Sequence, residues 1–263
     1  MRKISITYNS EICDANNLGK YLLEHRNNNT IINIIPFASH IEYEISVRSL
    51  SANPLYEKIS KAICMFILHD MRKGFMLDYA KSKAEILNAE EYSSLLKRLG
   101  KLFETPISAQ EYLCEQIKSV LIQYKTLSVD GFFRFRMRKE QAIWKTGVDM
   151  IADDIILERE YDNFIELMKV FLEVQVPKAD VVHVFVHNGT LKIFDENLNA
   201  YDTRRLKEIA VDMTCAPVCD EDITVSVLLA LAPRVIIIHN DSGDEPAALK
   251  TIKRVFDTRI CSD

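Results

Sequence analysis

Hydrophobic and polar residues alternate near the start of the chain, which is the pattern of a β-strand that buries one face. The alternation covers residues 4–8 and returns in residues 40–47, and β-branched and apolar residues predict another strand over residues 30–37. Between the strands predicted over residues 4–8 and 30–37, apolar residues recur at helical spacing at Ile12, Ala15, Leu18 and Leu22. The N-terminal part therefore predicts the order β-α-β-β.

The apolar spacing changes to the helical period across residues 53–177. Two helix starts carry the signature of a capping box, in which a polar residue caps the helix and a glutamate three residues later bonds back. These pairs are Asn88 with Glu91 and Ser108 with Glu111. The last helix of the region has its apolar positions at Phe164, Leu167, Met168 and Phe171. The middle of the chain thus predicts a series of amphipathic helices.

Strand patterns return after residue 177. Asn188-Gly189 separates two apolar segments and is a strong signal for a β-hairpin with a type I′ turn. In the first hairpin strand, alternate residues face opposite sides of the sheet, so two sets are expected: Val182, Val184 and Val186 on one side, and His183, Phe185 and His187 on the other.

Helices and strands alternate in the rest of the chain. Asp202 and Asp220 stand where helix caps are expected, and the continuous apolar run over residues 235–238 predicts a buried strand. A helix that starts near Asp244 and a last strand over residues 259–261 follow. A strand, a helix and a second strand in close succession imply a parallel pair.

These segments predict a helix-rich mixed α/β (α+β) fold: a β-α-β-β N-terminal part, a helical middle, and a β-hairpin plus α-β-α-β C-terminal part. We expect boundaries that divide the chain into an α/β part over residues 1–51, a helical region over residues 52–176 and an α/β part over residues 177–263. The two α/β ends are candidates for one compact unit with a shared sheet.

The composition argues for a globular protein in the cytoplasm. The 263 residues are enough to bury a sizeable core, and the net charge of −5 argues against a globally basic nucleic-acid binder. The most apolar run, residues 62–68, is far shorter than the ~20 residues that span a bilayer, and we expect no secretory signal.

Six cysteines are scattered along the chain without a CxxC pair, at positions 13, 64, 114, 215, 219 and 261. This spacing does not resemble a disulfide framework, and a chain of this length does not need one. Free thiols in a reducing compartment are therefore expected.

A basic segment in the helical region is the candidate interaction surface. It carries Arg134, Arg136, Arg138, Lys139 and Lys145 among aromatic residues. Such a segment can dock a protein, or it can bind the phosphates of a nucleic acid or of anionic lipids. In a purely structural interpretation, the arginines pair with the acidic run at Asp149, Asp153, Asp154 and Glu158. We expect Arg134 and Arg136 to be extended and to share one face, with the next helix starting near Arg138.

Three further groups carry weaker signals. A zinc site is poorly matched by the spacing of His183 and His187 with Cys215, Cys219 or His239. Paired carboxylates for acid–base catalysis are present at Asp153, Asp154, Glu158 and Glu160, but no nucleophile accompanies them. The loop over residues 240–244 stands where α/β folds bind phosphates, but it lacks the glycine patterns of nucleotide sites. We therefore assign no catalytic residue, no cofactor and no metal.

Three blocks of sequence are similar to a known family: Val129 to Arg136, Glu160 to Leu167 with Pro177-Lys178 and Val182 to Val184 after it, and Asp222 to His239. The first block reads VDGFFRFR, where the family shows a similar VDGF-x-RFR run. The chain resembles the YtxC family of sporulation proteins of endospore-forming bacteria over residues 108–239. The resemblance implies a setting in sporulation and carries no active site with it.

We therefore expect a sporulation-associated cytoplasmic protein that is non-enzymatic and acts through an unknown protein partner. One alternative is a nucleic-acid or anionic-membrane binder that uses the segment from Arg134 to Lys145. Another is an enzyme with its site near His183, His187 and His239.

Overall fold

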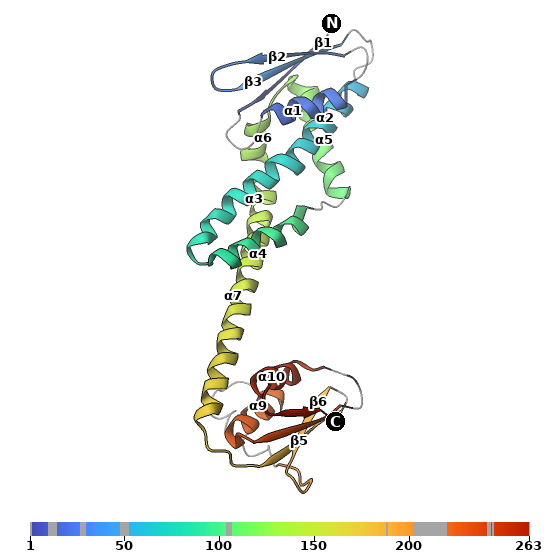
Figure 1. Ribbon diagram of the computed structural model, residues 1–263. Helices are drawn as coiled ribbons and strands as arrows, with labels where there is room; N and C mark the ends of the chain where they lie inside the picture. Colours follow the sequence, from blue (N-terminus) through green and yellow to red (C-terminus); the bar gives the residue numbers. More distant parts are fainter. Residues whose placement is uncertain are drawn as a thin grey trace. The chain divides into compact units, whose positions relative to one another are not determined.

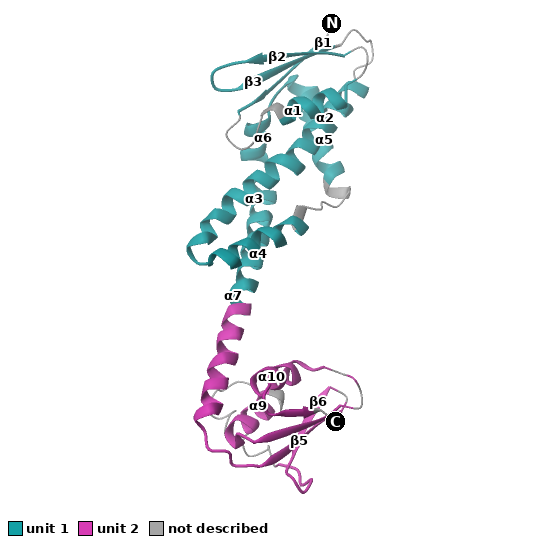
Figure 2. Ribbon diagram, in the orientation of Figure 1, with its two compact units in different colours: residues 1–157 teal, residues 158–263 magenta. Residues whose placement is uncertain are grey.

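The structure, a computed structural model, describes residues 2–9, 15–26, 30–47, 53–103, 107–187, 189–201, 220–240, 243 and 245–262 (Figure 1). Helices predominate and the strands form two small mixed sheets, so the predicted helix-rich α+β fold is confirmed. The chain divides into two compact units, residues 1–157 and residues 158–263 (Figure 2). The predicted three parts with boundaries at residues 51 and 176 stay a prediction.

Four strands form the sheet of the first unit in the order β2-β3-β1-β4: β1 Arg2–Tyr8, β2 Thr30–Pro36, β3 Ile41–Val47 and β4 Thr126–Ser128. β3 pairs antiparallel with β1 and β2, with Ile6 opposite Tyr43, and β4 pairs parallel to β1, with Ile6 opposite Leu127. Ile4, Ile6 and Tyr8 are buried, as alternation predicts. The predicted β-α-β-β order is confirmed, and β4 is an additional strand.

Besides the long helix α7, the described residues of this unit form these helices: α1 Ala15–Glu24 between β1 and β2, then α2 Asn53–Phe66, α3 Arg72–Lys81, α4 Ala89–Leu99 and α5 Ile107–Tyr124 between β3 and β4, and α6 Val129–Arg136 after β4. A π-helical turn, Ile67–Met71, joins α2 to α3. The predicted capping box at α4 is confirmed: Asn88 Oδ1 accepts the amide hydrogen of Glu91 at 2.9 Å, and Glu91 Oε2 accepts that of Asn88 at 2.8 Å. Phe66 of α2 packs edge-on against Tyr8 at 5.1 Å between ring centroids, which joins the helices to the sheet.

The longest helix, α7, spans Arg138–Val174. In the first unit, Val148 and Ala152 on this helix pack against α3 and α4. In the second unit, Ile165 and Leu172 belong to the core of that unit. The helix therefore contributes to a different core at each end.

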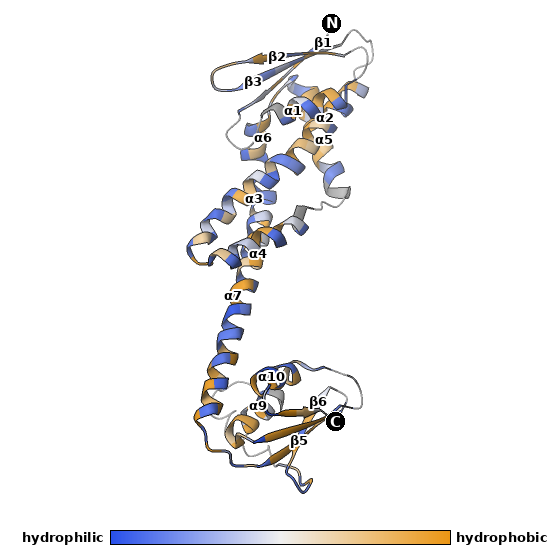
Figure 3. Cartoon of the chain, in the orientation of Figure 1, coloured by the Kyte–Doolittle hydropathy of each residue, from blue (hydrophilic) through white to orange (hydrophobic). Residues whose placement is uncertain are grey.

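The second unit contains a four-stranded sheet in the order β6-β5-β7-β8: β5 Val181–His187, β6 Thr190–Phe194, β7 Val235–Asn240 and β8 Ile260–Ser262. Figure 3 shows β5 and β6 as largely hydrophobic. β5 and β6 form the predicted hairpin, with His187 opposite Thr190. Gly189 has a φ of +72°, as a type I′ turn requires, and Asn188 lies outside the described residues.

After the hairpin, the described residues of the second unit form the helices α9 Asp220–Leu231 and α10 Ala247–Val255. They share a core with Val182 and Val184, so the predicted valine face of β5 is the buried one. β7 pairs parallel with β5 and with β8, which confirms the predicted parallel strands. The caps predicted at Asp202 and Asp244 fall outside the described residues.

The expectation of one sheet shared by the two ends is wrong, because their strands form two separate sheets. The first sheet completes its edge with β4, which the sequence did not predict as a strand. In the second sheet, β7 pairs with β5 of the hairpin and β8 pairs with β7, so all of its strands come from the C-terminal part of the chain.

Candidate functional site

The basic segment lies on two helices, so the prediction that Arg134 and Arg136 are extended and share a face is wrong. Ser128 caps α6 by accepting the amide hydrogen of Gly131 at 3.1 Å. Burial then follows the helical period, because Phe132 and Phe133 are buried whereas Phe135 is 68% exposed. The prediction that the next helix starts near Arg138 is confirmed, since α7 begins there.

All five basic side chains of the segment are exposed. The Arg138 guanidinium lies 5.8 Å from the centre of the Phe135 ring, and Lys145 Nζ lies 5.0 Å from the centre of the Tyr79 ring. Asp149, which the structural interpretation assigned to the arginines, accepts a hydrogen bond from the Tyr79 hydroxyl at 3.1 Å and forms an ion pair with Lys83. Part of this basic surface therefore rests on aromatic rings.

The start of α6 is tied to the first sheet through a partly buried carboxylate. Asp130 Oδ1 accepts the amide hydrogen of Asn9 at 2.7 Å, and Oδ2 accepts the Ser128 hydroxyl at 3.2 Å. Burial raises the pKa of Asp130, and these hydrogen bonds together with the nearby charge of Arg134 oppose that rise. Asp130 therefore positions the basic segment at an electrostatic cost to the folded state.

The histidines proposed for a metal or an enzyme site form a pair on the second sheet. His183 Nδ1 lies 2.9 Å from His239 Nε2, so one ring donates a hydrogen bond to the other, and Phe185 stacks on His239 at 4.2 Å. His187 is exposed at the end of β5. Within the described ranges, no three metal-binding side chains gather, and Cys215 and Cys219 lie outside them. The two histidines and Phe185 thus form a stacked row of rings in which one nitrogen of each histidine is hydrogen-bonded to the other histidine.

The loop after β7 is only partly described. The amide of Gly243 donates to Asn240 Oδ1 at 3.1 Å, and Gly243 has a φ of +72°. This hydrogen bond explains the turn as a local structure. Asp241, Ser242 and Asp244, the other residues of the candidate phosphate loop, lie outside the described residues.

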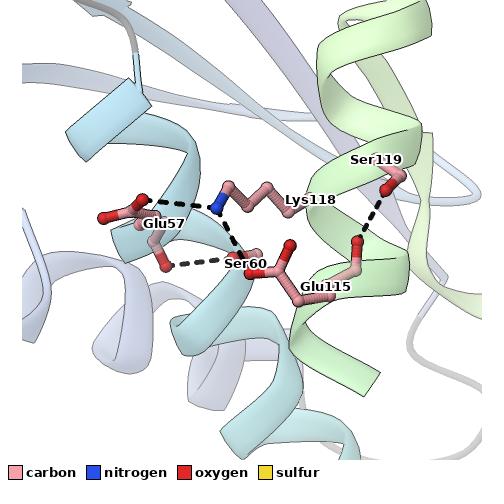
Figure 4. A network of polar contacts seen from close by, with 5 residues as sticks. All are labelled: Glu57, Ser60, Glu115, Lys118 and Ser119. Atoms are coloured by element: carbon pink, nitrogen blue, oxygen red, sulfur yellow. Dashed lines mark hydrogen bonds and ion pairs between the residues drawn. The ribbon is translucent and has the colours of Figure 1, made fainter. Parts of the chain in front are cut away.

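A polar network joins α2 to α5 in the first unit (Figure 4). Lys118 Nζ lies 3.3 Å from Glu57 Oε1 and 3.2 Å from Glu115 Oε1, and hydrogen bonds to these two carboxylates raise the pKa of Lys118. The network borders a surface cavity of about 580 Å³. The cavity is lined by Glu57, Ser60, Lys61, Gln110, Glu111, Cys114 and Glu115.

A second apolar row on α7 is the largest feature that the sequence analysis missed. Ile165 and Leu172 point into the core of the second unit, with Met168 packed against them. Five other apolar side chains on this stretch remain exposed, by between 43% and 77%, and we call them the outer face of α7: Phe164, Leu167, Val170, Phe171 and Val174.

The sequence pattern predicts one apolar face for Phe164, Leu167, Met168 and Phe171, but only Met168 packs against the core. At 100° per residue, the row of Phe164, Leu167 and Phe171 lies roughly 100° around the helix from the core-facing row. The signal for two rows was present in the sequence, since Ile165 and Leu172 repeat at seven residues in parallel with Phe164 and Phe171.

Acidic side chains accompany the outer face. Between residues 158 and 174, α7 carries five carboxylates and two basic residues. One of the two, Lys169, is held by Asp257 at 3.0 Å between Nζ and Oδ2. Two of the carboxylates are paired as well, Asp162 with Arg254 at 2.8 Å and Glu166 with Lys169 at 3.5 Å. The outer face is therefore apolar, and the helix stretch that carries it has an excess of carboxylates that neighbouring cations compensate in part.

No helix among the described residues has the length and apolarity that a bilayer crossing needs. The two histidines are hydrogen-bonded to each other and part of the basic segment contacts aromatic rings, whereas the outer face of α7 is an exposed apolar row among the described residues. Large exposed apolar rows of this kind are typical of binding sites.

Comparison with known proteins places the chain in a family. It is 19% identical over 161 residues to the protein named "Uncharacterized protein YtxC" of Bacillus subtilis (strain 168), an alignment that covers 59% of this chain and 54% of the relative. The chain thus spans about half the length of that curated relative. No solved structure matches. The model of the YtxC-like family matches residues 57–261, and the chain belongs to this family.

Proposed function

We propose that the protein is a non-enzymatic interaction component of sporulation that binds another protein through the outer face of α7. The sporulation setting is suggested by the family. We also place the protein in the cytoplasm, in accord with cysteines that are scattered along the sequence without the spacing of a disulfide framework. The observation that carries the binding function is the exposed apolar row from Phe164 to Val174 on a helix whose other side is anchored in a core.

The occupant that fits this surface is an amphipathic helix. Phe164 and Phe171 are seven residues apart, as are Leu167 and Val174, which is the spacing at which one helix receives the side chains of another. A partner helix laid along these positions covers apolar surface that is now in water. Each well-buried side chain of this size contributes about 1.5–3 kcal/mol.

The charge around the outer face favours a basic partner. Glu160 and Glu166 are exposed on the same stretch of helix, and its carboxylates outnumber its basic residues. A partner with lysine or arginine beside its apolar positions is complementary to this surface, which favours association and orientation. A second copy of the chain would bring like charges together in an isologous pair, so self-association is the disfavoured arrangement.

A designed peptide tests this proposal. The probe is a labelled amphipathic peptide of three heptads, with leucine at its a and d positions and lysine at its e and g positions. The matched control peptide carries glutamate in place of lysine. We expect fluorescence anisotropy to report binding of the lysine peptide and much weaker binding of the glutamate peptide.

Two variants locate the binding. Leu167→Glu lowers the affinity for the lysine peptide at least tenfold, equivalent to about 1.4 kcal/mol. This loss is expected although the added negative charge would strengthen a purely electrostatic attraction. Phe135→Glu, at an exposed apolar position on α6, is the matched control and leaves the affinity unchanged. Equal binding of both peptides, or no loss with Leu167→Glu, contradicts the proposal. If light scattering shows a stable dimer that Leu167→Glu dissociates, the outer face binds a second copy of the chain and the proposal of a basic partner helix is wrong.

A further inference from the structure

Two cysteines that are distant in the sequence meet at the contact between α2 and α5. Cys64 lies on α2 and is completely buried, and Cys114 lies on α5 and is half-buried. Their thiols are hydrogen-bonded to each other. Cys64 Sγ also lies 3.5 Å from the carbonyl oxygen of Gln110, one helical turn before Cys114. Both thiols are free, so the fold holds a reduced pair in place.

The two thiols differ in their access to solvent. Cys114 lines the cavity of about 580 Å³ between α2 and α5, beside Ser60, Lys61 and Gln110. Cys64 is absent from that lining and has no exposed surface. A small reagent in the cavity therefore reaches Cys114 directly and reaches Cys64 only through Cys114.

The surroundings also differentiate the thiols electrostatically. The hydrogen bond from Cys64 and the charge of Lys61 lower the pKa of Cys114, while burial and the carboxylates of Glu111 and Glu115 oppose that change. The same hydrogen bond and burial raise the pKa of Cys64. Cys114 is thus the better nucleophile, and Cys64 keeps its proton.

We propose that Cys114 is a peroxide-reactive modification site and that Cys64 is its resolving thiol. The Cys114 thiolate attacks a hydroperoxide, the O–O bond breaks, and Cys114 becomes a sulfenic acid while a hydroxide or alkoxide leaves and takes up a proton. The Cys64 sulfur then attacks the Cys114 sulfur, its proton leaves with the hydroxyl group as water, and the disulfide forms. The peroxide is reduced and the two thiols are oxidised.

Peptide mapping of the full-length chain tests the proposal. The reduced protein is treated with an equimolar amount of hydrogen peroxide, alkylated under denaturing conditions and digested with trypsin. Trypsin separates the two cysteines into the peptides 62–72 and 102–118, neither of which contains another cysteine. We expect these two peptides to appear joined by a disulfide and to separate on reduction. Cys261, exposed on β8, is the internal control. We expect it to stay reduced, and so to be alkylated, after longer exposure to peroxide than Cys114.

Two variants separate the roles of the thiols. Cys64→Ser leaves a sulfenic acid at Cys114 that dimedone traps, and Cys114→Ser leaves Cys64 unmodified. Dimedone labelling of the wild-type protein at early times is a readout that does not depend on the folding of either variant. Oxidation of Cys261 before Cys114, or oxidation of Cys114 without the joined peptides, overturns the proposal.

Discussion

Substitution of two nearby phenylalanines by alanine tests the helical geometry of the basic segment. If α6 is a helix, Phe133 faces the core and Phe135 faces solvent, as their exposed fractions of 1% and 68% indicate. If the segment were extended, the two rings would share a face and respond alike. We therefore expect Phe133→Ala to destabilise the first unit strongly and Phe135→Ala to have little effect.

The contacts of the two rings set the size of this difference. Phe133 packs against Phe75 at 5.8 Å and against Trp144 at 6.0 Å between ring centroids. Removal of a buried phenylalanine costs about 3–5 kcal/mol. Phe135 loses only the cation–π contact with Arg138, worth about 0.5–1 kcal/mol at an exposed site. The free energies of unfolding should thus differ by at least about 2 kcal/mol.

Denaturant unfolding measures the difference. Trp144 is the only tryptophan, and it lies in the first unit, so its fluorescence follows that unit separately from the second. Circular dichroism provides a second probe, because Phe133→Ala changes the surroundings of Trp144 directly. Equal destabilisation by the two variants would refute the helical assignment of α6.

Three further results are expected. Burial raises the pKa of Asp130 above its ordinary value of 3.8, so its protonated form favours the folded state below that pH, and this contribution is lost as the pH rises through the raised pKa. The unfolding free energy of the wild type relative to Asp130→Asn should therefore increase as the pH is lowered from 7 towards 4, and a constant difference would contradict the shift. Gly189→Ala should cost about 1 kcal/mol in thermal or denaturant unfolding, because alanine is strained at a φ of +72°; an unchanged midpoint would argue against the turn geometry. Neither the wild type nor the double variant Arg134→Ala, Arg136→Ala should bind DNA, RNA or anionic vesicles measurably at physiological salt. Salt-sensitive binding by the wild type that is lost in the double variant would support the alternative function.

Much of the fold could be predicted from local patterns. Alternation located β1 and β3, the Asn188-Gly189 pair located the hairpin, and the Asn88 capping box marked the start of α4. These features are set by residues that are neighbours in the sequence. β4 could not be found in this way, because it is three residues long and has a single buried side chain, Leu127, which gives no period to detect.

The errors at the site have a shared physical cause. In the segment from Phe132 to Arg136, alternating aromatic and basic residues imitate a strand, and the cap at Ser128 with burial of Phe132 and Phe133 decides for a helix. On α7, the apolar residues lie on two adjacent faces of the helix, and only the packing of Ile165 and Leu172 shows which face is buried. The Cys64–Cys114 pair depends on the packing of α2 against α5, which sequence spacing does not disclose.

The most direct test of the interaction surface is a methyl-resolved NMR titration with the lysine peptide. Leu167 and Val174 lie on the outer face of α7 and are 62% and 77% exposed, whereas Leu172 on the same helix is 3% exposed. Binding to the outer face predicts saturable shifts of the Leu167 and Val174 methyl signals, with Leu172 nearly unchanged. Shifts confined to other parts of the chain, or none at saturating peptide, would contradict the proposed function.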